Sequence, residues 1–123
     1  MSKKLILFIE DDAFLTQIYT KALEDAGYEV ITATSGEEGI KQAERNAPDL
    51  IILDIVLPHA HGYEIMETLK NNQKTSAIPI LVLTNMSGQE DVSEASRFGV
   101  AGYLIKAHTL PEDVVRKIAS LLQ

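Results

Sequence analysis

The chain has 123 residues, of which 46% are hydrophobic and 24% charged, and its formal net charge is -7 at pH 7. This length predicts one domain, residues 1–123, with a buried core, and the acidic balance disfavours direct nucleic-acid binding, which needs a basic surface. Cysteine is absent, which excludes disulfides and thiolate metal sites, and no apolar run reaches the roughly 18 residues of a membrane-spanning helix. We therefore expect a cytoplasmic location with no membrane partner.

Short apolar segments along the chain predict five β-strands. Three of them are almost continuously apolar, which is typical of parallel strands covered by helices on both faces. The segment 29–33 is more mixed and suits an edge strand. The predicted strands are Leu5–Ile9, Glu29–Ala33, Leu50–Asp54, Ile80–Thr84 and Gly102–Ile105.

Helical patterns alternate with these strands. The first predicted helix has an apolar stripe of Phe14, Ile18, Ala22 and Leu23, and it stops near Gly27. Three later helices begin with a pattern typical of a capping box, in which a hydroxyl and a carboxylate satisfy free backbone N–H groups. These patterns are Ser35–Glu38, Ser87–Glu90 and Thr109–Glu112, and the remaining helix is predicted from about Gly62 to Asn71.

The regular alternation of strands and helices predicts an α/β fold with a doubly wound parallel sheet and right-handed crossovers. The glycine-rich dinucleotide fingerprint is absent, because acidic residues follow the first strand. No phosphate-binding P-loop motif occurs either. We therefore predict the flavodoxin-like five-stranded order 2-1-3-4-5, with helices on both faces of the sheet.

Polar residues follow the ends of four predicted strands. They are Glu10–Asp12, Asp54, Thr84–Asn85 and Lys106. In open α/β sheets the ligand binds at the carboxyl ends of the strands, so we expect these groups to share one crevice. Clustered carboxylates need a cation, and oxygen ligands favour Mg²⁺. A metal, a hydroxyl and an ammonium around one carboxylate suit phosphoryl transfer with Asp54 as nucleophile.

This pattern resembles the receiver domain of two-component response regulators, from the first strand to the last helix. In order along the chain, the matching features are Glu10–Asp12, Asp54 with Pro58 and Gly62 downstream, Thr84, and Gly102–Lys106.

The resemblance implies that Asp54 accepts a phosphoryl group, in a Mg²⁺-dependent reaction, from a sensor histidine kinase or a phosphotransfer protein. It implies a signalling domain that catalyses its own phosphorylation and dephosphorylation, and not an enzyme acting on another substrate. The implied Mg²⁺ ligands are Asp11 and Asp54 directly, Glu10 through a water, and the backbone carbonyl of Val56.

The resemblance also implies a switch. The implied phosphoryl-binding groups are Thr84, Lys106 and the backbone N–H of Asn85, and Tyr103 is the aromatic residue that moves on activation. The fourth helix, fifth strand and fifth helix would then present a changed face to a downstream target, an effector domain or a second copy. We expect no effector domain within these residues, which leaves open a free-standing receiver or part of a longer regulator.

The sequence departs from the family pattern at three positions. Ala107 follows Lys106 where the family usually has proline after a cis bond. A cis bond before alanine costs about 3 kcal/mol, so we expect a trans bond here. We also expect phosphorylation to be coupled more weakly to the switch than is usual in the family. Asn85 stands where a small residue is usual, and its bulk would restrict entry of the donor. Leu57 replaces a more frequent methionine.

Two alternative functions stay open. A receiver-like module that binds a partner without being phosphorylated is compatible with Ala107 and Asn85. An aspartyl-phosphate phosphatase of the haloacid dehalogenase type is disfavoured, because that family places a second acid two residues after its nucleophile, whereas the acids after the first strand here are adjacent.

Overall fold

The computed structural model describes residues 3–57 and 60–123. Its main sheet has five parallel strands in the order β2-β1-β3-β6-β7. Because β6 and β7 are the fourth and fifth strands of this sheet, the order confirms the predicted flavodoxin-like topology. The strands are β1 Leu5–Ile9, β2 Glu29–Ala33, β3 Leu50–Leu53, β6 Ile80–Thr84 and β7 Gly102–Ile105.

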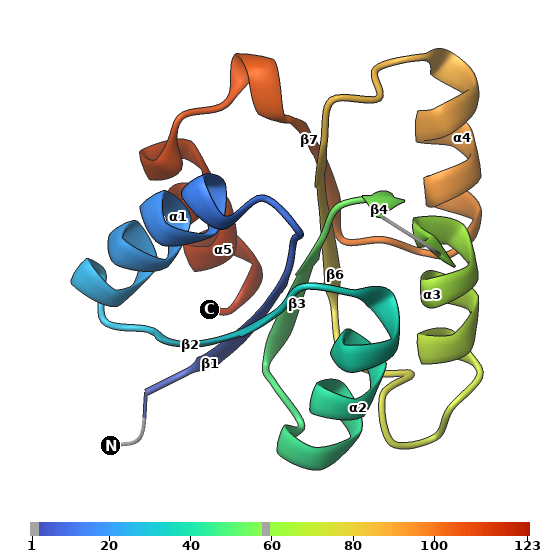
Figure 1. The fold of residues 1–123 in the computed structure, drawn as a ribbon, viewed down its shortest axis with the longest axis horizontal. Helices are drawn as coiled ribbons and strands as arrows, with labels where there is room; N and C mark the ends of the chain where they lie inside the picture. The colour runs from blue at the N-terminus through green and yellow to red at the C-terminus, as the bar shows by residue number, and fades with distance from the viewer. Residues whose placement is uncertain (1–2, 58–59) are drawn as a thin grey trace.

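Helices cover both faces of this sheet (Figure 1). The pair α1 and α5 packs on one face, and α2, α3 and α4 pack on the other. Within the described residues, none of the helices has the length and apolar character needed to cross a membrane. The helices are α1 Ala13–Asp25, α2 Gly36–Asn46, α3 Gly62–Lys70, α4 Gln89–Arg97 and α5 Pro111–Leu121, with a short 3₁₀ helix, η1, at Lys106–His108.

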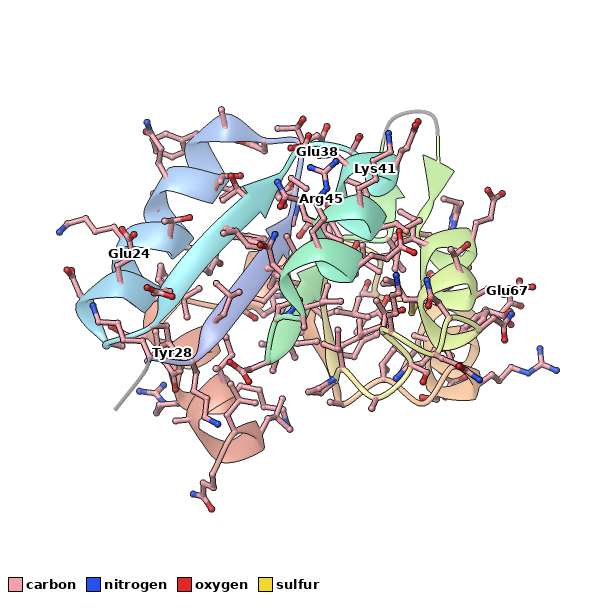
Figure 2. The ribbon with its side chains drawn as sticks, turned by 90° about the horizontal axis from the view of Figure 1, so that it is seen from below. Glu24, Tyr28, Glu38, Lys41, Arg45 and Glu67 are labelled. Atoms are coloured by element: carbon pink, nitrogen blue, oxygen red, sulfur yellow. The ribbon has the colours of Figure 1, made fainter. Side chains whose placement is uncertain are left out.

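Strands β1 and β3 are apolar along their whole length, and β6 is apolar up to Thr84, because both faces of these strands are buried. In β1, Ile6 and Phe8 face the layer of α1 and α5, whereas Leu7 and Ile9 face the other layer. Polar side chains stay on the outside of the helices, as Arg45 on α2 and Glu67 on α3 show in Figure 2. The two layers together bury both faces of the sheet.

The buried face of α1 differs from the predicted stripe. Phe14 is 69% exposed and Ile18 is 36% exposed, whereas Tyr19 and Leu23 are buried and Leu15 packs beside them. The prediction was wrong for Phe14 and Ile18 because it followed hydropathy alone. The buried row is one residue further along, and it includes a tyrosine whose hydroxyl donates to the carbonyl of Thr109 at 3.3 Å.

One of the three predicted capping patterns is confirmed as a cap. The Ser35 hydroxyl accepts a hydrogen bond from the backbone N–H of Glu38 at the start of α2. Helix α4 begins one residue later than predicted, after Gly88, with acidic side chains in its first turn, where the helix dipole favours them. Helix α5 begins after Leu110, and the Thr109 hydroxyl donates to the Ile105 carbonyl instead.

The segment after β3 contains a short antiparallel pair that the sequence did not predict. Strands β4 Val56–Leu57 and β5 Ala60–His61 form it, and β3 itself ends at Leu53, so Asp54 lies just beyond the strand. Pro58, one of the features that match the receiver pattern, lies outside the described residues. The N–H of Gly62 donates to the Ile55 carbonyl at 2.9 Å, and this bond holds the start of α3 beside the residue that follows Asp54.

We expect Gly62→Ala to destabilise the protein by about 3 kcal/mol, because the added methyl group overpacks the segment behind Asp54. An added Cβ would lie 2.3 Å from the Cα of Ile55, which is backbone and cannot move aside. The control is Gly88→Ala, where the nearest atom is a side-chain oxygen of Asp91 at 3.1 Å. The control should lose less than about 1 kcal/mol in chemical denaturation, and equal losses would contradict the explanation.

Candidate functional site

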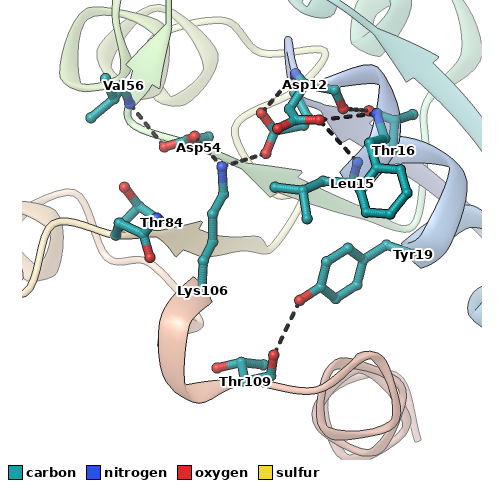
Figure 3. Close-up of polar contacts among 12 residues, drawn as sticks. Asp12, Leu15, Thr16, Tyr19, Asp54, Val56, Thr84, Lys106 and Thr109 are labelled. Carbon is teal, nitrogen blue, oxygen red and sulfur yellow. Dashed lines mark hydrogen bonds and ion pairs between the residues drawn. The ribbon is translucent and has the colours of Figure 1, made fainter.

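Three of the side chains predicted to share a crevice, Asp54, Thr84 and Lys106, lie together at the carboxyl edge of the sheet (Figure 3). The Lys106 ammonium, at the end of β7, lies 2.6 Å from the carboxylate of Asp54, which follows β3. It also lies 2.6 Å from the carboxylate of Glu10, which follows β1. One cation therefore joins two carboxylates from different strands.

Asp54 is almost fully enclosed, with 5% of its surface exposed. Its Oδ1 accepts a hydrogen bond from the N–H of Val56 at 3.0 Å, and its Oδ2 accepts one from Lys106. Its own N–H donates to the carbonyl of Ile9 at 3.3 Å. A buried carboxylate held this way has a fixed orientation, as a nucleophile needs.

The acidic residues after β1 have different roles. Carboxylate oxygens of Glu10, Asp11 and Asp54 all lie within 4.8 Å of one another, with Asp11 exposed and the other two buried. Asp12 instead caps α1, because its Oδ1 accepts from the N–H groups of Phe14 and Leu15. Three converging oxygen donors of this kind fit a hard divalent cation such as Mg²⁺.

Burial and charge act against each other in this cluster. Burial raises the pKa of Glu10 above its ordinary value, although the bond to Lys106 partly offsets it. Burial lowers the pKa of Lys106, but its hydrogen bonds to Asp54 and Glu10 outweigh burial and leave the pKa raised. The lysine is therefore charged at neutral pH and balances the carboxylates.

The remaining predicted residues lie beside this ion pair. Thr84 is fully buried at the end of β6, and its hydroxyl accepts from the N–H of Met86 at 3.4 Å. Tyr103 on β7 is half-buried, and its hydroxyl donates to the Met86 carbonyl at 2.6 Å. The Asn85 side chain is exposed and accepts from the N–H of Ala107 at 3.0 Å.

The comparison with known proteins supplies the family. The chain matches the "Response regulator receiver domain" family over residues 6–119. The chain belongs to this receiver family. Receiver domains are the signalling domains of two-component response regulators.

Named relatives of this receiver differ in length and in what their names describe. The chain is 36% identical over 123 residues to the "Alkaline phosphatase synthesis transcriptional regulatory protein PhoP" of Bacillus subtilis (strain 168), matching all of this chain and 50% of PhoP. It is 30% identical over 108 residues to the "Polar-differentiation response regulator DivK" of Brucella ovis, covering 88% of each chain. The chain thus spans half the length of PhoP and most of DivK.

A solved structure agrees with this assignment. The chemotaxis protein CheY4 of Vibrio cholerae superimposes with a TM-score of 0.91 and 30% sequence identity, covering 98% of this chain and 100% of CheY4. The likeness extends over the whole sheet and its helices.

Sequence reasoning missed three polar contacts of this receiver. Asp12 matched an acidic cluster but serves as a helix cap, a role that its position before an apolar helical run could have indicated. The bond from Tyr19 to the Thr109 carbonyl joins residues far apart in the chain and leaves no local signal. The bond between Asn85 and Ala107 joins two residues that the sequence had marked separately as departures.

We expect Lys106→Met to destabilise the protein by about 3 kcal/mol at pH 8 in the presence of a chelator, because two enclosed carboxylates lose their only nearby ammonium among the described contacts. The control is Lys21→Met, which breaks an exposed pair with Asp25 and should cost less than about 0.5 kcal/mol. Denaturant unfolding measures both variants.

The loss in Lys106→Met should shrink as the pH falls toward 5. A buried carboxyl whose pKa is higher in the folded than in the unfolded protein costs stability as pH rises through that interval. Burial raises the pKa of Glu10, and the variant lacks the hydrogen bond to Lys106 that lowers it. Glu10 therefore takes up a proton as the pH falls, and the folded variant no longer buries a charged carboxylate there. A loss that is the same at pH 5 and pH 8 would contradict this account.

Proposed function

We propose that this receiver accepts a phosphoryl group on Asp54 from the phosphohistidine of a sensor kinase or a phosphotransfer protein, and that residues 1–123 act as one receiver unit. The observation that carries the proposal is the enclosed Asp54 carboxylate, oriented by Val56 and paired with Lys106 at the carboxyl edge of the sheet. Location in the cytoplasm, where two-component kinases act, is part of the proposal.

Mg²⁺ belongs to this proposal because the donor set suits it. Asp11 and Asp54 would hold the ion directly, Glu10 through a water, and the Val56 carbonyl would complete the site. The ion would neutralise charge on the phosphoryl oxygens during transfer. The mutual repulsion of the three carboxylates, of which Lys106 neutralises only a part, favours binding of such a cation.

In the transfer step, one oxygen of Asp54 attacks phosphorus, a P–O bond forms, and the P–N bond to the donor histidine breaks. The imidazole leaves with its electron pair and takes up a proton. The acyl phosphate leaves less charge on the Asp54 oxygens, so Lys106 becomes available to the phosphoryl oxygens. The Thr84 hydroxyl and the N–H of Asn85 are the other groups proposed to bind them.

The contacts around Thr84 support the proposed switch. A phosphoryl group adds about -1.5 to -2 of charge, which attracts the Thr84 hydroxyl. That hydroxyl is bonded to the N–H of Met86, and the Met86 carbonyl is bonded to Tyr103. A shift of Thr84 therefore reaches β7 and changes the face of α4, β7 and α5 toward a target, an effector domain or a second copy. The ring of Tyr103 is half-buried here, and its movement on activation stays a prediction.

Incubation with acetyl phosphate and Mg²⁺ should add the mass of one phosphoryl group in an acid-stable, base-labile linkage. Asp54→Asn should abolish the labelling because the nucleophile is lost, and Asp11→Ala should remove most of the Mg²⁺ affinity and slow the labelling. Intact-protein mass spectrometry measures the product. Labelling of Asp54→Asn at another residue would refute the assignment, and a wild-type chain that never labels would favour the unphosphorylated binding module.

The phosphoryl group should be long-lived. Water attacks an acyl phosphate in line, and by similarity Val56 and Met86 flank that path. Neither side chain can orient a water or accept its proton. The double variant Val56→Asn with Met86→Glu should therefore lose phosphate about tenfold faster or more, as measured by the decay of the labelled mass. An unchanged or slower decay would show that these two side chains do not control the water.

A further inference from the structure

The Asn85 side chain bridges two segments of the site that are separated in sequence. Its Oδ1 accepts a hydrogen bond from the N–H of Ala107 at 3.0 Å, across a separation of 22 residues. Asn85 follows Thr84 at the end of β6, and Ala107 follows Lys106 at the end of β7. The bond therefore joins the immediate neighbours of the two side chains proposed to bind the phosphoryl oxygens.

The donor of this bond exists only because residue 107 is not proline. Alanine retains a backbone N–H, whereas proline, the residue usual in the resembling family, has none. Cis peptide bonds are absent from the described part of the chain, which confirms the trans bond expected before Ala107. Two of the three departures from the family pattern thus meet in one contact, in which Asn85 supplies the acceptor and Ala107 supplies the donor.

Other side chains hold the turn at Lys106–His108, which follows β7, through hydrogen bonds to different segments. The Thr109 hydroxyl donates to the Ile105 carbonyl at 2.6 Å, and the Tyr19 hydroxyl donates to the Thr109 carbonyl at 3.3 Å. These contacts attach the turn to β7 and to α1. Among the described side-chain hydrogen bonds, the one that Asn85 accepts from Ala107 connects the turn to the segment that carries Thr84.

We propose that Asn85 is a positioning residue, whose carboxamide holds the Ala107 amide and so keeps the Lys106 ammonium and the Thr84 hydroxyl in fixed relation. The proposal rests on the function proposed above, since it assigns Asn85 to the binding of the phosphoryl group. It replaces the expectation that Asn85 acts only by its bulk.

The first experiment tests the contact without any phosphorylation. In Asn85→Ala, the amide hydrogen of Ala107 should exchange with water about tenfold faster than in the wild-type protein, as NMR measures it, because its acceptor is gone. Asn85→Asp retains an acceptor oxygen and should restore slow exchange. An exchange rate that does not change in Asn85→Ala overturns the proposal. Asn85 is exposed, so all three proteins should fold equally well.

The second experiment tests the consequence for the site. Asn85→Ala should weaken the binding of beryllofluoride with Mg²⁺ by about tenfold, and it should slow labelling by acetyl phosphate. If Asn85 acts by bulk alone, the same variant opens the site and labelling becomes faster, which overturns the proposal. The control is Ser87→Ala, an exposed neighbour in the same segment, which should behave as the wild-type protein.

A double-variant comparison isolates the hydrogen bond itself. Ala107→Pro removes the donor, so Asn85→Ala should cause no further loss of beryllofluoride affinity in that background, and a full additional loss overturns the proposal. Ala107→Gly retains the donor and should preserve the effect of Asn85→Ala. Absence of wild-type labelling refutes the proposed function, whereas the exchange of the Ala107 amide still decides whether Asn85 holds this turn.

Discussion

The ion pair of Lys106 with Asp54 and Glu10 is the interaction on which the candidate site depends. Two carboxylates that are almost fully buried would repel each other and would each lose their hydration without a partner. The lysine comes from 52 residues further along the chain than Asp54, so the pair forms only when the sheet is complete. The Asp54 carboxylate is therefore oriented by the fold, and the cluster of Glu10, Asp11 and Asp54 keeps an exposed side at Asp11.

Much of the fold could be predicted because it depends on local pattern. The continuous apolar runs of β1, β3 and β6 reflect burial on both faces, and four strand-end polar groups pointed to one shared crevice. The features that sequence did not predict depend on tertiary contacts. The buried face of α1 includes Tyr19, whose hydroxyl has a hydrogen-bond partner in the Thr109 carbonyl. Hydropathy alone favoured Phe14, which is exposed. The β4–β5 pair is too short to show a period.

The family match describes what this chain shares with other receivers, and the structure describes the contacts at the positions where it departs from them. The match over residues 6–119 and the likeness to CheY4 concern the receiver, whose overall fold is shared. PhoP, DivK and CheY4 are named for alkaline phosphatase synthesis, polar differentiation and chemotaxis, so one receiver architecture serves different outputs. Residues such as Asn85 and Ala107 are where one member departs from the pattern, and a pair of departures that touch is more informative than either alone.

The position of β7 at the edge of the sheet has a consequence for dynamics. It pairs with a single neighbour, β6, and its four residues are all only half-buried, whereas β3 is fully buried between two strands. Segments with fewer buried contacts open at lower free-energy cost than the global unfolding of the protein. We therefore expect the strand that supplies Tyr103 and leads into Lys106 to open at a lower free-energy cost than the strand leading into Asp54. The more easily opened edge strand thus leads to the lysine that pairs with a carboxylate fixed at the buried centre of the sheet.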